Sequence, residues 1–400
     1  MIFARRAEYP RAIGGKALCW LGQLEEIENG LRKSEETALA DASSDTFASE
    51  YADQARQGAT IVPRILYFVD VQESAAALTP RIKKVSSQRS SQEKEPWKSL
   101  QPRELVNAPI EEEHIWNIYL GETVAPYVLL EPRKAVLPVR HGETLEEPKA
   151  DDDTTCGMKT SAMNHRMRDR WKIISDLWDK TKTSNNKLSL VGRLNYQKGL
   201  SAQLDDYAPI RLLYATSGRP TAAVMHSPEN FDSKDGEQLS TDSLSSVARI
   251  SEGQKKIDES DTFHSFNAPL ATLVDTSLYW VKCKTLEEAY YLAAIINSST
   301  LEQAVQKFMP KGQFGARHLH KHLWRLPIPI YDNDNSLHAN LSQLGNQLAT
   351  EAATHLTNIR TTRASANKPT TINVARRELR KWLSTHPPAQ QIEQLVDQIL

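Results

Sequence analysis

Hydrophobic positions in the C-terminal half of the chain recur at helical spacing. Thr285-Leu-Glu-Glu288 fits a capping box, in which the Thr hydroxyl serves the amide of residue 288 and Glu288 reaches back. The positions that form the predicted buried stripe of this helix are Leu286, Ala289, Ala293 and Ile296. Asn297-Ser-Ser299 ends this helix and caps a second one over residues 300–309. Residues 335–400 also follow a helical pattern, with a polar gap near 365–371.

Other stretches alternate, or run apolar over a few residues, in the manner of β-strands. Residues 210–226 read as a β-hairpin around Ser217-Gly218-Arg219-Pro220. The remaining predicted strands are Ala59–Val71, His114–Leu120, Tyr127–Leu130, Ala135–Val139 and Leu278–Cys283. Together these elements predict an α+β fold: a mixed or antiparallel sheet, supporting helices and a C-terminal helical tail.

Polar segments suggest where the chain divides. We expect an N-terminal helical segment (1–56), a β-rich region (57–150), an α+β region (151–330) and the helical tail (331–400). Within the third region, the Ser-, Asp-, Glu- and Lys-rich residues near 227–262 predict a disordered insertion.

Two further polar or basic segments leave alternatives open. Residues 80–98 predict a mobile basic segment, either a solvated loop or a phosphate-contacting arm. Residues 141–162 are acidic and predict a boundary or flexible loop. The helix predicted over 165–182 carries Arg and Lys in its first turns, where positive charge opposes the helix dipole, so these side chains serve a partner or simply a solvated face.

Composition narrows the function classes. The 400 residues carry a net charge of −1, which argues against a protein that coats nucleic acid uniformly, so any such role must be local. The three cysteines, Cys19, Cys156 and Cys283, are too few and scattered for a disulfide framework or a zinc site. No apolar run approaches a membrane span and the N-terminus has no signal-peptide pattern, so we expect a cytoplasmic protein without membrane contact.

One stretch, Lys311–Ile330, gathers positive charge without opposition. No Asp or Glu occurs between Glu302 and Asp332, whereas five cations do: Lys307, Lys311, Arg317, Lys321 and Arg325. Glycines 312 and 315 let backbone amides approach a phosphate closely, and Arg, Lys and His donate to phosphates or base edges. The stretch therefore predicts a DNA-binding surface, with a solvated basic loop as the competing interpretation. The candidate DNA-binding residues are Lys311, Phe314, Arg317, His318, His320, Lys321 and Arg325.

Two details of this stretch leave alternatives open. Phe314 either stacks on a base or anchors the loop in the core. His318, His320 and His322 would share one face of a strand, which raises a metal hypothesis. The absence of a nearby carboxylate and the neighbouring cations weigh against it, so we expect no metal ligands here.

The familiar catalytic and cofactor motifs do not occur in the sequence. It contains no phosphate-cradling glycine loop, no nucleophile elbow and no zinc-binding helix motif. We therefore expect no catalytic and no cofactor-binding residue in this chain.

Several motifs, taken in order, resemble a known family. Tyr290-Tyr-Leu-Ala-Ala-Ile-Ile-Asn-Ser-Ser299, the glycine-basic loop and His320-Lys-His-Leu-Trp-Arg-Leu-Pro-Ile-Pro329 are similar to the C-terminal target-recognition region (TaqI-like specificity domain) of bacterial N6-adenine DNA methyltransferases of restriction-modification systems. Gln57–Arg64, Leu194–Gln203 and Val374–Arg380 resemble other pieces of the same region. The resemblance runs in fragments from about Gln57 onward, and Ile296 stands where the family motif has leucine.

The family's catalytic half has no counterpart in the sequence. Neither the Asn/Asp-Pro-Pro-Tyr/Phe tetrapeptide that holds the flipped adenine nor the glycine-rich S-adenosylmethionine motif is present. The resemblance thus implies sequence-specific recognition of double-stranded DNA, with chemistry and S-adenosylmethionine supplied by a partner methyltransferase subunit or domain. The alternatives are an active methyltransferase with diverged motifs, or a non-functional fragment of one.

Overall fold

The structure is a computed structural model, and it describes residues 49–72, 81–89, 93–100, 107–143, 163–183, 186–206, 208–226, 271–308 and 319–400. Residues 49–400 form one compact unit. Residues 1–48 of the predicted N-terminal helical segment, the predicted insertion at 227–262 and most of the acidic segment at 141–162 lie outside the described residues.

A four-stranded antiparallel sheet forms one part of this unit. In spatial order its strands are β1 (Ala55–Gln57), β12 (Leu278–Lys282), β9 (Ile210–Ala215) and β10 (Ala222–His226). The predicted hairpin is confirmed, because β9 pairs directly with β10. Its turn contains Gly218 at φ +84°, a backbone conformation that glycine adopts without a steric penalty.

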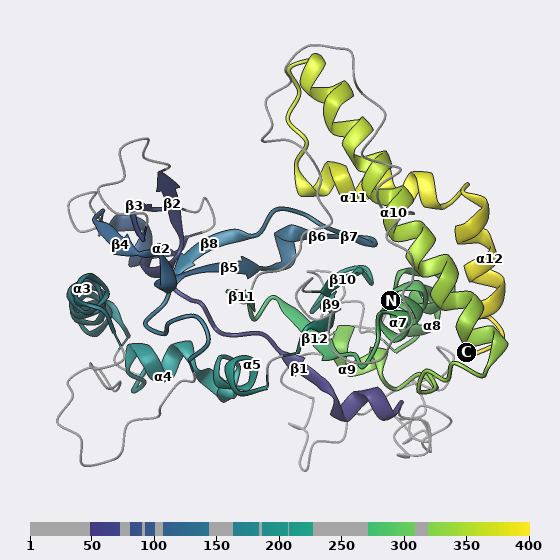
Figure 1. Ribbon diagram of the computed structural model, residues 1–400, viewed down its shortest axis with the longest axis horizontal. Coiled ribbons are helices and arrows are strands. Elements are labelled where there is room, and N and C mark those ends of the chain that lie inside the picture. Colours follow the sequence, from purple (N-terminus) through teal and green to yellow (C-terminus); the bar gives the residue numbers. More distant parts are fainter. Residues whose placement is uncertain are drawn as a thin grey trace, which may run out of the picture. The chain divides into compact units, whose positions relative to one another are not determined.

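A group of helices lies beside this sheet, and α7 packs directly on β9 and β10 (Figure 1). They are α7 (Leu286–Asn297), α8 (Ser299–Gln306), α9 (Leu319–Leu323), α10 (Ser336–Ser365), α11 (Ile372–Leu383) and α12 (Pro387–Val396). Helix α7 is buried well beyond the predicted stripe, since every residue from Tyr291 to Ile296 is buried between the sheet and α10. The predicted helical tail and its polar gap are confirmed by α10, α11 and α12.

Helices α10 and α7 approach each other closely at a glycine. A Cβ atom built on Gly345 of α10 would lie 2.3 Å from the carbonyl oxygen of Tyr290. Only a residue without a side chain fits there, so Gly345 permits the contact between the two helices.

The second part of the unit has smaller sheets. Strands β2 (Val69–Gln72), β3 (Ile82–Ser87) and β4 (Pro109–Glu111) form an antiparallel sheet in that order. Strand β5 (Ile115–Tyr119) pairs in parallel with β11 (Thr272–Val274) and antiparallel with β8 (Arg133–Val136), so this sheet is mixed. Strands β6 (Val124–Ala125) and β7 (Val128–Leu129) form a short hairpin.

Short helices accompany these sheets. The α-helices are α2 (Arg64–Tyr67), α3 (His165–Thr181), α4 (Leu190–Leu194) and α5 (Ser201–Asp205). The 3-10 turns are η3 (Glu50–Asp53), η4 (Trp97–Ser99), η6 (Glu112–His114), η7 (Gly121–Thr123) and η9 (Tyr196–Lys198). Helix α3 buries Trp171, Ile174 and Trp178, three of the four positions that its pattern predicts. The fold is therefore α+β, with mixed and antiparallel sheets and a C-terminal helical tail, as predicted.

One strand assignment and one loop assignment were wrong. In the stretch 59–71, residues Arg64–Tyr67 form α2 and only the end of the stretch belongs to β2. Pro63 precedes the helical turn, and Ile65, Leu66 and Tyr67 are all buried, so the apolar run reflects burial and not an extended strand. The predicted basic loop at 80–98 contains strand β3, which pairs on both edges.

The capping box at α7 forms differently from the prediction. The Thr285 hydroxyl accepts a hydrogen bond from the amide of Glu288 at 3.2 Å, as expected. The Glu288 carboxylate instead accepts from the amide of Lys284 at 2.6 Å and from the Tyr51 hydroxyl at 2.9 Å. Glu288 therefore ties the start of α7 to the segment that precedes β1.

Candidate nucleic-acid interface

The predicted basic stretch is only partly described. Lys311, Phe314, Arg317 and His318 lie outside the described residues, so their proposed roles stay predictions. The backbone of Lys321 lies in helix α9, together with His320. The interpretation that His318, His320 and His322 share a strand face was wrong, because residues 319–323 are helical and positions two apart on a helix diverge.

Helix α9 is held in place by hydrogen bonds to the sheet. The amide of Leu319 donates to the carbonyl of Thr216 at 3.1 Å, directly before the β9–β10 turn. The Trp324 indole donates to the Tyr214 hydroxyl of β9 at 2.8 Å. The His320 ring stacks on Tyr279 of β12, with ring centroids 4.1 Å apart. The end of the basic stretch is therefore fixed to strands β9 and β12.

Arg325 follows α9 and is exposed. Among the described residues no carboxylate pairs with it, so its charge is available to a ligand. This agrees with its predicted role as a phosphate contact without testing that role.

The Leu-Pro-Ile-Pro-Ile segment that follows is not a strand. Its residues are extended but pair with no sheet, since Pro327 and Pro329 lack the N–H that a ladder requires. The segment is instead fixed by its carbonyl groups, of which Ile328 accepts from the Ser49 hydroxyl at 2.6 Å and Pro329 from the Tyr291 hydroxyl at 3.1 Å.

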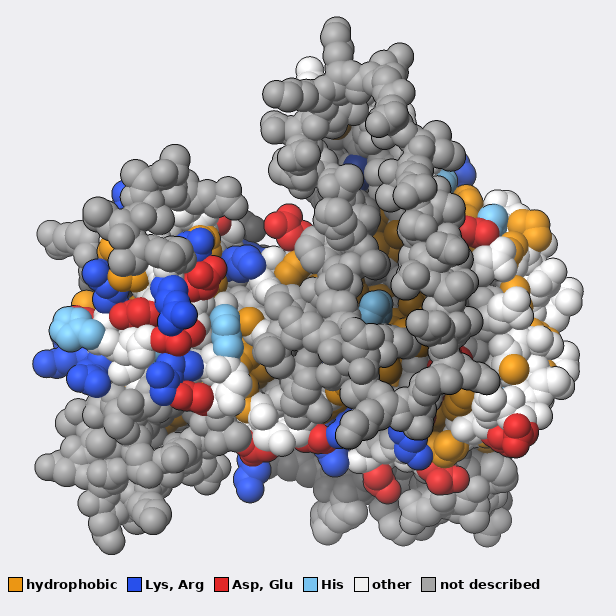
Figure 2. Space-filling model, viewed as in Figure 1, with side chains coloured by type: hydrophobic (Ala, Val, Ile, Leu, Met, Phe, Trp, Pro, Cys, Tyr) orange, Lys and Arg blue, Asp and Glu red, His pale blue; other side chains and the backbone are white. Residues whose placement is uncertain are grey.

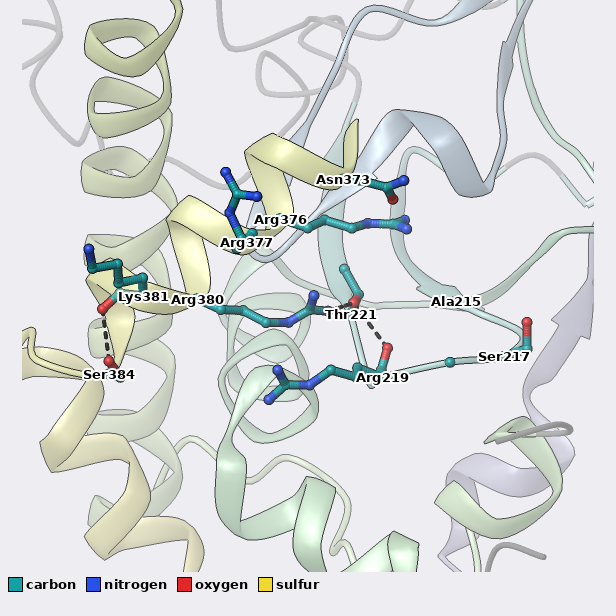
Figure 3. A pocket seen from close by; sticks show the side chains of 11 residues that line it. Ala215, Ser217, Arg219, Thr221, Asn373, Arg376, Arg377, Arg380, Lys381 and Ser384 are labelled. Atoms are coloured by element: carbon teal, nitrogen blue, oxygen red, sulfur yellow. Dashed lines mark hydrogen bonds between the residues drawn. The ribbon is translucent and has the colours of Figure 1, made fainter. Parts of the chain in front are cut away.

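A second basic cluster lies beside the β9–β10 turn. A cavity of about 540 Å³ opens between this turn and helix α11 (Figure 3). We call it the α11 cavity, and its lining residues are Ala215, Ser217, Gly218, Arg219, Thr221, Asn373, Arg376, Arg377, Arg380, Lys381 and Ser384. Five of these side chains are cationic and none is acidic.

Two of the five cations have carboxylate partners. Arg219 forms a two-pronged pair with Glu302 at 2.7 and 2.6 Å, and Arg377 pairs with its neighbour Glu378 at 2.8 Å. The other three, Arg376, Arg380 and Lys381, have no carboxylate partner among the described residues. These three side chains therefore lack a direct ion pair, although Glu302 attracts Arg380 and Lys381 acts on Glu378 at longer range.

The two central arginines are held by neutral oxygen atoms. Arg380 donates to the Thr221 hydroxyl at 2.6 Å. Arg376 donates to the carbonyl of Val124 at 2.9 and 2.7 Å, and to that of Gly121. In Figure 3 the Arg380 side chain extends from α11 to Thr221, and the Arg376 side chain extends from the same helix without reaching Thr221.

Burial and mutual repulsion act on this charge. The pKa of the Arg380 guanidinium is lowered to about 10, first because burial removes it from water and then because Arg219 and Arg376 repel it. Burial also lowers the pKa of Arg376. Arginine stays charged at neutral pH even so, which means that the repulsion remains in the folded protein.

The cationic residues of α11 were not among the sequence-predicted site residues. Their spacing indicates a cationic helix face, because Arg376 and Arg377 are followed by Arg380 and Lys381 three or four positions later on the same helix. The hairpin turn that completes the cavity lies more than 150 residues earlier in the chain, so only the fold brings the two together.

The predicted basic segments near β3 and α3 have a different environment. Figure 2 shows basic and acidic side chains intermixed on the surface over α3 and the β2–β3–β4 sheet. Lys83 lies 3.7 Å from Glu112, and Arg140 pairs with Glu143. Arg170 of α3 is buried and donates to the carbonyl of Leu66 at 3.1 Å, which is a structural role.

In the described part of the chain, no group of three or more His, Cys, Asp or Glu is arranged to hold a metal ion. None of the described helices combines the length and apolar character that a membrane span needs. No protein-family model matches the chain, and no curated protein matches it in sequence.

Proposed function

We propose that this protein recognises a DNA sequence for an adenine-N6 DNA methyltransferase of a restriction-modification or phage-defence system. The partner methyltransferase subunit or domain supplies the catalytic residues and S-adenosylmethionine. The chain supplies a cationic surface that lies against double-stranded DNA.

One observation supports this proposal above the others. The basic stretch that lacks Asp and Glu is fixed at its end to the β9–β10 turn through Leu319 and Thr216. The same turn lines the α11 cavity. Cations distant in sequence therefore belong to neighbouring elements, although the chain as a whole is nearly neutral. A local surplus of Lys and Arg is the electrostatic feature of proteins that bind nucleic acid.

The direct test is selection from a pool of random duplexes. Purified full-length chain, in 100 mM salt, is expected to enrich duplexes that share a short motif containing adenine. The enriched duplex is then expected to bind at least 10³-fold more tightly than unrelated duplex, roughly the lower bound for specific recognition. If repeated rounds enrich no motif, sequence recognition is excluded.

A calorimetric titration with S-adenosylmethionine separates the proposal from its main alternative. Recognition without catalysis predicts no binding to the isolated chain. A saturable signal with one site per chain would favour a methyltransferase with diverged motifs.

A further inference from the structure

The C-terminal tail holds a cluster of charge that its packing role does not require. Helix α11 buries Ala375 and Leu379 against the core, which is sufficient to fix it. Its cationic face, however, is turned to the α11 cavity, where Arg380 and Arg376 contact only neutral oxygen atoms. A helix that served packing alone would gain stability from carboxylates near these arginines.

We propose that the α11 cavity binds a phosphodiester group of the DNA backbone, so that the tail forms part of the DNA-binding surface. This inference rests on the proposed function. It adds a second contact region to the predicted stretch at 311–325 and assigns Arg380 as its central residue, flanked by Arg376 and Arg219.

The chemistry of the cavity fits this ligand. Arginine presents a planar set of N–H donors that matches two phosphate oxygens, and partly buried guanidinium groups are more readily dehydrated than ammonium groups. Hydroxyl and amide groups of Ser217 and Asn373 on the rim are further donors to phosphate oxygens. Within the described residues, no acceptor meets the amide N–H groups of Ser217 and Gly218.

Charge balance supports the same ligand. The pKa of Arg380 is lowered by burial and by repulsion from Arg219 and Arg376. A monoanionic phosphodiester among these groups offsets the repulsion, whereas a neutral ligand does not.

The cavity also adjoins the predicted basic stretch. Thr216, which accepts the hydrogen bond from Leu319, immediately precedes Ser217 on the cavity rim. The start of α9 and the rim of the α11 cavity are therefore neighbours in the fold.

The experiment measures how duplex affinity depends on salt concentration in the full-length chain. Arg380→Gln removes the charge but keeps a donor for Thr221. We expect it to flatten the slope of log K against log salt by about 0.9, the contribution of one phosphate contact to B-DNA. Arg380→Lys keeps the charge and is expected to retain most of the slope.

A second variant tests the site without removing a structural contact. Asn373 is exposed in the first turn of α11, where a carboxylate is favourable for the helix. Asn373→Asp is therefore expected to fold as well as the parent chain, yet to weaken duplex binding about tenfold at 50 mM salt, as the loss of one phosphate contact does. Asn358→Asp, the same change at an exposed position of α10 outside the cavity, is the matched control and is expected to bind like the parent.

The outcomes distinguish this inference from the proposed function. If the parent chain binds duplex and both Arg380→Gln and Asn373→Asp keep its affinity and slope, the cavity is not a phosphate site, although DNA recognition stands. If the parent chain binds no duplex at all, both proposals fail. An equal loss in Asn358→Asp and Asn373→Asp would show a general charge effect and would also overturn the inference.

Discussion

The surface over α3 and the β2–β3–β4 sheet and the α11 cavity are both rich in Lys and Arg, but their charges have different partners. On the first surface, Lys83 and Arg140 face Glu112 and Glu143, and acidic side chains lie among the basic ones (Figure 2). In the α11 cavity, Arg376, Arg380 and Lys381 have no carboxylate partner in the described part of the chain.

The difference shows that the number of cations in a segment says little about binding. Exposed pairs such as Lys83 with Glu112 contribute little stability and leave little net field. Cations that repel one another across a cavity produce a potential that attracts an anion. Within the predicted arm at 80–98, Lys83 has an acidic neighbour in Glu112, which lies 29 residues later in the chain, so the fold and not the local sequence supplies its partner.

The largest effect on stability is expected from a change at the close contact between α10 and α7. Gly345→Ala forces a Cβ atom against the Tyr290 carbonyl, and we expect unfolding free energy to fall by about 1–3 kcal/mol, the usual range for overpacking. Urea denaturation measures it. Because α11 packs on α10, duplex binding is expected to weaken as well.

The control for this change lies on the next residue. Asn346→Ala places the same side chain at an exposed position of α10 and is expected to be neutral or slightly stabilising. A Gly345→Ala variant as stable as Asn346→Ala would mean that α10 and α7 are not in close contact.

A smaller effect concerns pH and the sheet region. His114 is fully buried, and burial lowers its pKa below 6.5. Its Nδ1 faces the Leu137 carbonyl at 3.0 Å and its Nε2 the Asn164 amide at 3.4 Å, which matches a neutral ring. The unfolded chain takes up a proton that the folded chain rejects, so stability is lost as pH falls below about 6.5, the unfolded value.

Urea denaturation at pH 7.5 and 5.5 tests this expectation. His114→Asn keeps a donor for Leu137 and is expected to lose less stability between the two pH values than the parent chain does. His165→Asn, the same replacement at an exposed histidine of α3, controls for the effect of the replacement itself. An identical pH dependence in His114→Asn and the parent would contradict the assignment.

The smallest effect on stability and on duplex binding is expected at the surface over α3 and the β2–β3–β4 sheet. Lys83→Gln removes one positive charge, as Arg380→Gln does, but from a half-exposed pair with Glu112. We expect stability to change by less than about 1 kcal/mol and the salt slope of duplex binding to stay the same. A slope flattened as much as in Arg380→Gln would place the β3 surface on the DNA as well and would remove the contrast between the two regions.

Much of the fold follows from local pattern. The hairpin at 210–226, helix α3 and the helices of the tail were predicted because their periodicity and turn residues agree with their tertiary roles. The stretch at 64–67 was predicted wrongly because a fully buried apolar run has no periodicity that separates strand from helix.

The candidate site was less accessible from sequence. The cations of α11 are visible as a pattern, but the neighbours of Arg380, which are Thr221 and Arg219, become apparent only when β9, β10 and α11 meet. The absence of a charge partner is a property of three-dimensional contacts, and no local pattern encodes it.

The short segment before β1, which begins at Ser49, limits how far the protein can be truncated from its N-terminal side. Ser49 bonds to the carbonyl groups of Trp324 and Ile328, Tyr51 bonds to Glu288, and β1 covers the edge of β12. A fragment trimmed to begin at Gln57, where the family resemblance starts, would leave the buried Glu288 carboxylate without the Tyr51 hydroxyl and would expose an unpaired sheet edge. We therefore expect a fragment that begins at Ser49 to resist urea better than one that begins at Gln57.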